Sequence, residues 1–259
     1  MITVPENYTD FLHWVKEKTE LFWSNLTPGD GMFNTKWISL TENTIESIEK
    51  KYRIEFTTEH RAFLRILHAI DRPLDAEYVD DGGAIAIRKE PLYYNWLEDE
   101  KDIVDKLAWP YRTILEDILW VNQVWAGSWG PKPATDEEKI RIFSEVFSKA
   151  PKVFPLRDRT FLINEPAIPD APALSIVGSD TIIAGWNLRH HLLYEFYVPL
   201  GLSVPASEES EGITYYYEDI SDELMEIHKI EDAKGWARVI PFWSEMIAYR
   251  SSSWKGFSV

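Results

Sequence analysis

The sequence has 259 residues, a formal net charge of −16 and no cysteine, and it contains 12 Trp, 12 Tyr and 12 Phe. This apolar and aromatic content excludes a disordered chain, and the absence of cysteine excludes a disulfide framework, a cysteine zinc site and thiol catalysis. The acidic balance disfavours binding to nucleic acid or to anionic membranes, since both are held by Lys and Arg, and it suits a basic partner.

The first predicted element is an amphipathic helix over residues 8–23, because Phe11, Leu12, Val15 and Phe22 recur at near-helical spacing with charges between them. The same segment has neither the basic start nor the apolar core of a secretory signal. No stretch of the chain approaches the ~18 apolar residues of a membrane span. We therefore expect a soluble, cytoplasmic protein.

Two further helices follow. In "NTIESIEKKY" Asn43 is the expected N-cap, with Glu46 three residues later. In "TTEHRAFLRILHAI" the expected cap is Thr57 or Thr58, and the helix continues to Ile70.

The next stretch, "AEYVDDGGAIAI", is typical of a β-hairpin whose turn is formed by Asp81, Gly82 and Gly83. An amphipathic helical pattern then covers residues 99–120, and we expect Pro110 to interrupt or kink it. A Gly- and Pro-rich loop leads to a helix capped by Thr135 or Asp136. "KVFPL" and "TFLIN" predict short strands.

Residues 174–196 predict a strand, a three-residue loop of Gly178, Ser179 and Asp180, a second strand, and a helix capped by Asn187. The polar residues of this segment therefore have local structural roles. Asp180 serves the turn, and Arg189 and His190 lie on the helix surface. We interpret the segment as scaffold and not as an active site.

An acidic segment follows Pro205. Between Ser207 and Asp232 one lysine, Lys229, stands against ten acidic residues: Glu208, Glu209, Glu211, Glu218, Asp219, Asp222, Glu223, Glu226, Glu231 and Asp232. The tail after it, "KGWARVIPFWSEMIAYRSSSW", is apolar again and is expected to pack back on the domain.

No catalytic motif stands out. The chain lacks H-E-x-x-H, G-x-S-x-G, and both common phosphate-binding glycine motifs. His190 and His191 are neighbours on a predicted helix and therefore point about 100° apart, which makes a shared metal difficult. The histidines are interpreted as helix-surface or partly buried residues, and we expect no metal and no cofactor.

Helices come first in the chain, and strands mixed with helices follow, which favours an α+β fold over a regular βαβ alternation. The segments "WAGSWGPKPATDEEKIRIFSEVFSKAPKVFPLRDRTFLINEP" and "ALSIVGSDTIIAGWNLRHHLLYEF" resemble the bacterial branch of the SMI1/KNR4 (SUKH) family, and "IESIEKKYRIEFTTEHRAFLRIL" resembles its opening helices. The matching residues are Trp125, Trp129, Gly130, Lys132, Pro133, Pro151, Pro155, Arg159, Ser175, Asp180, Ile182, Gly185, Leu188, Leu192, Glu195 and Phe196.

The resemblance implies a mixed, largely antiparallel sheet flanked by helices. It also implies one domain over residues 1–259, with a family-like core at about 42–196, an N-terminal helical extension (1–41) and an acidic C-terminal extension (197–259). Bacterial members of the family resemble immunity proteins that neutralise toxin domains, often nucleases or deaminases, whereas fungal relatives are regulatory and scaffolding proteins.

The hypothesis is thus a non-enzymatic protein that binds a basic toxin domain, since a nuclease is basic where it holds its substrate. Aromatic residues among charges are typical of interface hot spots. The predicted partner-binding residues are Glu208, Glu209, Glu211, Tyr215, Tyr217, Glu218, Asp219, Asp222, Glu223, Trp125 and Trp129.

Three alternatives stay open. The acidic segment is a solvated face whose tyrosines alternate in and out of the core. The protein is a regulatory scaffold. Or it is a carboxylate-dependent hydrolase whose cleft holds Trp96, Trp109, Trp120, Trp125 and Trp129. The sequence assigns neither a particular toxin nor an oligomeric state.

Overall fold

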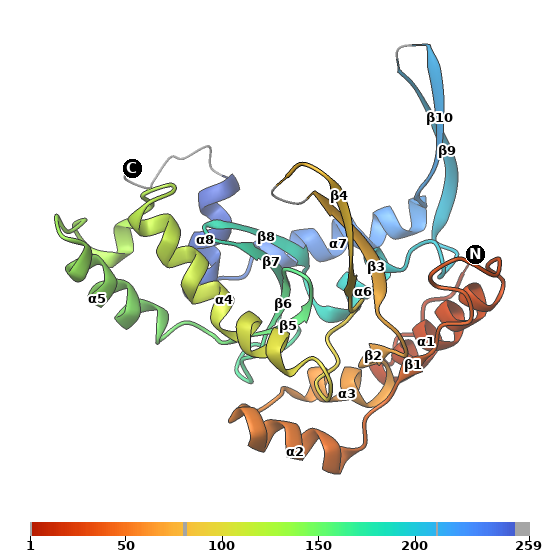
Figure 1. The fold of residues 1–259 in the computed structure, drawn as a ribbon, viewed down its shortest axis with the longest axis horizontal. Coiled ribbons are helices and arrows are strands. Elements are labelled where there is room, and N and C mark those ends of the chain that lie inside the picture. The colour runs from red at the N-terminus through yellow and green to blue at the C-terminus, as the bar shows by residue number, and fades with distance from the viewer. Residues whose placement is uncertain (1, 80–81, 211, 252–259) are drawn as a thin grey trace. The chain divides into compact units, whose positions relative to one another are not determined.

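The computed structural model describes residues 2–79, 82–210 and 212–251 (Figure 1). The helices are α1 (Tyr8–Ser24), α2 (Glu42–Tyr52), α3 (Thr58–Ile66), α4 (Glu100–Leu119), α5 (Asp136–Phe147), α6 (Leu188–Glu195), α7 (Asp222–Trp236) and α8 (Trp243–Ser251), with a short 3-10 helix at Gly127–Trp129. The strands are β1 (Trp37–Ile38), β2 (Ala69–Ile70), β3 (Leu74–Val79), β4 (Ile85–Glu90), β5 (Val153–Arg157), β6 (Thr160–Ile163), β7 (Ala173–Val177), β8 (Asp180–Gly185), β9 (Ser203–Ser210) and β10 (Ile213–Ile220).

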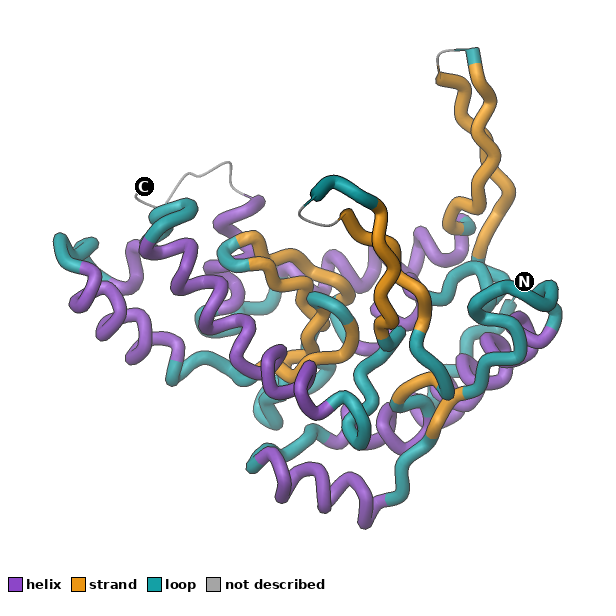
Figure 2. Tube along the Cα trace, in the orientation of Figure 1, coloured by secondary structure: helices purple, strands orange, loops and turns teal. Residues whose placement is uncertain are grey.

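The α+β class is confirmed (Figure 2). Every pairing between these strands is antiparallel, in a four-stranded sheet of order β5-β6-β7-β8 and in the pairs β1-β2, β3-β4 and β9-β10. Three of the four sheets join strands that follow one another directly along the chain. The exception is the short β1-β2 pair, whose strands are separated by α2 and α3.

Contacts divide the chain into two compact units, each made of two segments. The first unit is Met1–Asn95 with Leu188–Gly235, and the second is Trp96–Asn187 with Trp236–Val259. These limits differ from the predicted boundaries at residues 41/42 and 196/197. That the whole chain behaves as one domain stays a prediction.

Helix α1 opens the first unit. The side chain of Asn7 caps it by accepting a hydrogen bond from the Asp10 backbone N–H, and Phe11, Leu12 and Val15 are buried as predicted. Phe22, in contrast, is half-buried.

Helix α2 begins two residues earlier than the predicted cap implies, at Glu42. Thr41 therefore takes the cap that was expected at Asn43, and its hydroxyl accepts from the Thr44 backbone N–H. Helix α3 is capped by Thr57, as predicted, but ends at Ile66. Ile70 is buried as part of β2 and not as part of a helix.

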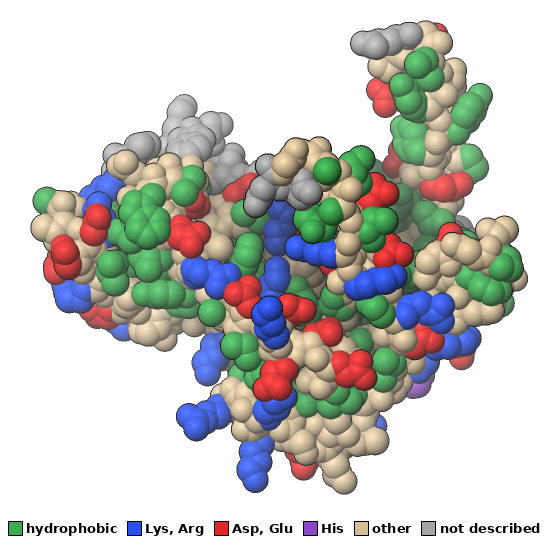
Figure 3. All heavy atoms as spheres, viewed as in Figure 1, with side chains coloured by type: hydrophobic (Ala, Val, Ile, Leu, Met, Phe, Trp, Pro, Cys, Tyr) green, Lys and Arg blue, Asp and Glu red, His purple; other side chains and the backbone are tan. Residues whose placement is uncertain are grey.

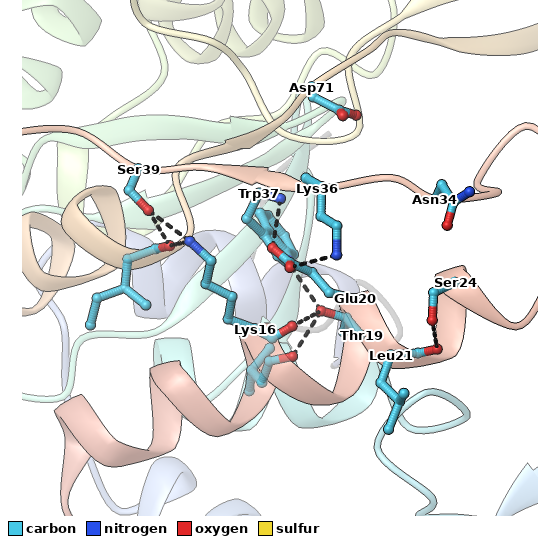
Figure 4. Close-up of polar contacts among 12 residues, drawn as sticks. Lys16, Thr19, Glu20, Leu21, Ser24, Asn34, Lys36, Trp37, Ser39 and Asp71 are labelled. Carbon is cyan, nitrogen blue, oxygen red and sulfur yellow. Dashed lines mark hydrogen bonds and ion pairs between the residues drawn. The ribbon is translucent and has the colours of Figure 1, made fainter.

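Helix α1 is attached to β1 through side chains on one face (Figure 4). The indole N–H of the buried Trp37 donates to the Thr19 hydroxyl at 2.8 Å, and the Trp37 backbone N–H donates to a Glu20 carboxylate oxygen at 3.1 Å. Lys16, one turn earlier, donates to the Ser39 hydroxyl at 2.9 Å. Because positions 16, 19 and 20 share a face, one side of the helix supplies all three contacts.

Aromatic rings form the core of the first unit. Trp37 packs against Trp23, Tyr93 and Phe196 with ring centroids 5.6–5.7 Å apart, and Tyr93 also contacts Phe63 at 5.4 Å. This cluster joins α1, β1, α3 and the residues after α6 into one hydrophobic centre.

The surface positions predicted for α6 are wrong. His190 and His191 are each only 4% exposed. His190 stacks on His228 of α7, with ring centroids 5.3 Å apart, and His191 lies beside the Tyr93 hydroxyl. Arg189 is half-buried, with its guanidinium over the ring of Phe11.

Buried histidines in this unit have low pKa values. Burial, together with a smaller effect of the neighbouring His68, lowers the pKa of His60 from its ordinary 6.5 to about 3. Burial likewise lowers the pKa of His68 to about 4, and burial followed by the proximity of His228 lowers the pKa of His190 to about 4. All three are therefore neutral in the folded protein near pH 7.

The second unit is built on the β5–β8 sheet, and α4 is fixed to its β7–β8 turn by a polar stripe. The Trp109 indole N–H donates to the Ile176 carbonyl at 2.8 Å, and the Thr113 hydroxyl accepts from the Gly178 backbone N–H at 3.2 Å. The buried carboxylate of Asp117 accepts from both the backbone N–H and the hydroxyl of Ser179, each at 2.6 Å. These three helix residues are spaced by four and therefore lie on one face.

The turn itself is tighter than predicted. Val177 pairs with Asp180, so the loop contains only Gly178 and Ser179, and Asp180 belongs to β8. Gly178 has a φ of +59°, and a Cβ there would lie 2.3 Å from an Asp117 carboxylate oxygen. This position therefore requires glycine.

Helix α4 continues through Pro110, where an interruption or kink was expected. Buried side chains on both sides of it, Ile103 and Ile114 among them, hold the two halves in the second unit. The C-terminal tail packs back as predicted. Trp243 of α8 is fully buried, and its indole N–H donates to the Pro151 carbonyl at 2.8 Å.

Over the described part of the chain, the helices are too short or too polar for any of them to traverse a lipid bilayer.

We predict that Gly178→Ala lowers the free energy of unfolding by about 2–4 kcal/mol, because it combines a positive φ with displacement of a buried hydrogen-bonded carboxylate. Urea denaturation measures this loss. Asp117→Ala alone is expected to cost about 1–3 kcal/mol. In the double variant the loss is smaller than the sum, since the clash disappears with the carboxylate. Additive losses would contradict this contact.

We also predict that the free energy of unfolding falls as the pH drops from about 6.5 towards 5. The unfolded chain takes up protons on His60, His68 and His190 near pH 6.5, whereas the folded chain does not, so protons favour unfolding. The expected slope is up to about 1.4 kcal/mol per pH unit for each histidine.

Chemical denaturation at several pH values checks this slope. His60→Phe should flatten it, because the phenyl ring fits the same aromatic site without titrating. His13→Asn at an exposed position should leave it unchanged. Stability that stays constant from pH 6.5 to 5 would show that the buried histidines do not control it.

Candidate interaction surface

The most exposed strands of the first unit are β9 and β10, which form a long hairpin (upper right in Figure 1). Ile, Thr and Tyr favour extended backbone in β10. Ser210 pairs with Ile213, and Gly212, directly before Ile213, has a φ of +79°, which is typical of a hairpin turn. The register then continues without a shift to Ser203 and Ile220. We call β9 and β10 together the acidic hairpin.

The base of the acidic hairpin is firmly attached. The Ser221 backbone N–H donates to the Leu202 carbonyl at 2.8 Å, and the Tyr197 hydroxyl donates to the Glu218 carbonyl at 3.0 Å. Leu202 and Leu224 on either side of the hairpin are fully buried. Beyond this base, nearly every residue of the two strands is exposed.

Apolar side chains lie on both faces of the hairpin. The register places Val204, Tyr215, Tyr217 and Ile213 on one face, and Tyr216 on the other. The three tyrosines are 53%, 84% and 47% exposed in chain order. Contiguous exposed apolar surface of this kind is typical of interaction sites and not of ordinary monomer surface.

Carboxylates lie among these apolar side chains. Glu208 and Glu209 of β9 and Glu218 and Asp219 of β10 are exposed, and Figure 3 shows the hydrophobic and acidic side chains along this hairpin. The sequence has no Lys or Arg from residue 201 to 228. Among the described residues none of these four carboxylates forms an ion pair with a basic side chain, so their negative charge is directed to solvent.

The β3–β4 hairpin provides an internal comparison. It also exposes apolar residues, with Val79, Ile85 and Ile87 more than 60% exposed. Two of the three carboxylates on its strands, however, are compensated, because Lys89 pairs with Asp75 across the strands at 2.6 Å and Arg88 pairs with Glu90. The acidic hairpin therefore differs by its uncompensated charge.

The contact residues predicted in the acidic segment fall into three groups. The structure brings Glu208, Glu209, Tyr215, Tyr217, Glu218 and Asp219 together on the acidic hairpin. Glu211 lies outside the described residues. Asp222 and Glu223 follow the hairpin in the first turn of α7, where negative charge favours the helix N-terminus, so these two also have a structural role.

The prediction that Trp125 and Trp129 bind a partner is wrong. They are 1% and 8% exposed and belong to the core of the second unit, so they do not offer surface to a partner. The Trp125 indole N–H donates to the Gly130 carbonyl at 2.8 Å, and Trp129 stacks on Phe242 with parallel rings. The loop that carries them is folded inward because their rings fill space between α5 and the residues before α8.

Tyr216 was missed. It is the most exposed tyrosine of the hairpin, but an alternating strand with one buried face would place it opposite Tyr215 and Tyr217 and away from a common surface. The signal that identifies it is the absence of apolar alternation in β9, whose polar sequence cannot form one face of a core.

The tryptophan cleft of the hydrolase hypothesis is not formed as expected. Trp96, Trp125 and Trp129 are buried, and Trp120 is exposed. A cavity of about 220 Å³ in the second unit is bordered by Trp129 and Phe242, but it carries a single carboxylate, that of Glu245. The described residues contain no group of three His, Asp or Glu side chains arranged to hold a metal ion.

A scan against protein-family models gives no match to this chain, and searches of curated proteins and of solved structures give no significant match either.

We predict that substitutions at buried and at exposed aromatic positions change the free energy of unfolding by very different amounts. Trp125→Ala should lower the free energy of unfolding by about 3–5 kcal/mol, because it empties a buried site. Tyr216→Ala should change it by less than about 0.5 kcal/mol, because the ring contacts solvent. Urea denaturation followed by circular dichroism measures both. A large loss for Tyr216→Ala would mean that the hairpin face is covered in the folded protein.

Proposed function

We propose that this chain is an immunity protein that binds a basic toxin domain and neutralises it through the acidic hairpin. The observation that carries the proposal is the combination of three exposed tyrosines with four unpaired carboxylates on one small element. Tyrosine supplies rigid apolar contact area that tolerates water, and carboxylates supply attraction to Lys and Arg.

The charge distribution supports a basic partner. The chain as a whole carries −16, and the acidic hairpin adds local charge that no described basic side chain neutralises. A toxin that acts on nucleic acid needs a positive groove, so such a hairpin competes with the substrate for that groove.

The resemblance of residues 42–196 to bacterial immunity proteins supports the biological role of this binding. It concerns mainly the scaffold, however, whereas the acidic hairpin lies beyond residue 196. Recognition of one particular toxin is therefore assigned to a segment that the resemblance does not cover.

The direct test is co-expression with the toxin domain encoded beside the gene. We expect cells that make both proteins to survive, and the triple variant Glu208→Gln, Glu209→Gln, Glu218→Gln to lose protection. A matched control changes Glu17, Glu98 and Glu137 to Gln, which removes the same charge from exposed positions elsewhere. If the unmodified protein does not rescue the cells, the immunity proposal fails for that pair.

Salt dependence tests the electrostatic contribution. We expect the association rate to fall roughly tenfold or more between low and high ionic strength, because steering acts through screened charges. Stopped-flow or surface-based kinetics measure it. The hairpin triple variant should lose most of this salt dependence, and the control triple should keep it. Equal effects of the two triples would assign the attraction to net charge and not to the hairpin.

A further inference from the structure

Along the acidic hairpin, the contacts that the structure gives fix which backbone groups bond between the two strands and which point outward. In antiparallel pairs, opposite residues alternate between those that bond to each other and those whose N–H and C=O groups point outward. The Ser221 N–H bonds to the Leu202 carbonyl, so this pair is of the bonded kind. Counting along the register makes Pro205 and Glu218 an outward-pointing pair.

Two other observations agree with the assignment of Pro205 and Glu218 as an outward-pointing pair. Proline has no N–H to donate, so Pro205 fits only a position that needs no bond to β10. The carbonyl of Glu218 accepts a bond from the Tyr197 hydroxyl, which requires that it points away from β9. The same alternation makes Thr214 and Tyr216 outward-pointing residues on the free side of β10.

The two edges of the hairpin therefore differ. On β9 the outward positions include Pro205, the third residue of the strand, which removes one N–H from this edge near the base of the hairpin. Strand β10 has eight residues without proline, lysine or a register shift, and it pairs with no other strand in the part of the chain that the structure describes. Such an edge is a template for one more strand.

We infer that the partner adds an extended basic segment to the free edge of β10, so that the hairpin becomes a three-stranded sheet. This inference rests on the proposed binding function and specifies how the partner engages. Backbone bonds from Thr214, Tyr216 and the Glu218 N–H supply the pairing, and the tyrosines flank the added strand.

The charges determine the kind of segment. Each face of the hairpin carries apolar side chains and two carboxylates, with Glu218 and Asp219 next to the free edge. An added strand in which Lys or Arg alternates with apolar residues directs its basic side chains to the two carboxylates of one face and its apolar side chains to the exposed tyrosine surface of the other. A second copy of this chain would place like charges beside each other, which is destabilising.

A peptide of about eight residues that alternates lysine and valine, with blocked ends, serves as the probe. We expect the amide exchange of Thr214, Tyr216 and Glu218 to slow roughly tenfold on saturation, measured by NMR. The outward amides of Ser207 and Glu209 on β9 should not change. Equal binding by a glutamate–valine peptide would overturn the charge requirement.

Proline variants test the edge itself. Thr214→Pro removes one outward N–H of β10, and we expect it to weaken binding of the lysine–valine peptide about tenfold. Thr214→Ala controls for the side chain. Ser207→Pro places the same residue at an outward position of β9, and both controls should bind within about twofold of the unmodified protein.

Equal affinity of Thr214→Pro and Thr214→Ala would overturn the inference, and so would equal losses in Thr214→Pro and Ser207→Pro. If the unmodified protein forms dimers without peptide and Thr214→Pro is monomeric, the edge of β10 binds a second copy of this chain. That result would also overturn the inference. Edge pairing with the peptide but no neutralisation of the toxin domain would contradict only the proposed function. If Thr214→Pro still neutralises the toxin domain, only the inferred pairing at the edge of β10 is contradicted.

Discussion

Backbone hydrogen bonding between antiparallel strands is the interaction on which this architecture depends, and in three of the four sheets it joins chain neighbours. Local pairing satisfies the backbone of each strand on one side but leaves the outer strands of every sheet with an unpaired side. In the second unit the polar stripe of α4 fastens the helix to the β7–β8 turn, so that the four-stranded sheet becomes part of a core. In the first unit the β9–β10 pair receives no such cover and extends from a buried base.

Local features of the sequence were sufficient to predict most elements. The spacing of Phe11 and Val15 predicts α1, Thr57 predicts the start of α3, and the residues around Gly178 predict the β7–β8 turn. The errors concern properties that depend on distant contacts. His190 is buried because His228, on a helix 38 residues later, stacks on it. The interruption expected at Pro110 does not occur, because buried side chains on both halves of α4 pack into the same unit, whereas the expected kink stays a prediction. Neither contact is visible in a window of neighbouring residues.

The candidate surface was predictable in composition but not in geometry. The run of carboxylates and tyrosines is evident in the sequence, and it gave six of the residues that the hairpin brings together. The predictions of aromatic contact residues failed in two ways: two buried residues were included, and one exposed residue was left out. Trp125 and Trp129 are predicted as contacts, but the large rings of this Gly- and Pro-rich loop fold into the core of the second unit. Tyr216 is not among the predicted contact residues, although over the described part of the chain it is the most exposed tyrosine of the hairpin.

The hydrogen bond from the Tyr197 hydroxyl to the Glu218 carbonyl limits the length of the free edge of β10. It closes the lower end of the β10 edge, while the turn after Ser210 closes the upper end. At about 3.4 Å per residue, the interval from Thr214 to Glu218 is roughly 14 Å long. The free edge of β10 is thus bounded at both ends, and the strand that we infer to pair with it would have this length over which to bond. A change at residue 197 that removes this hydroxyl, such as Tyr197→Phe, would free the Glu218 carbonyl and lengthen the available edge.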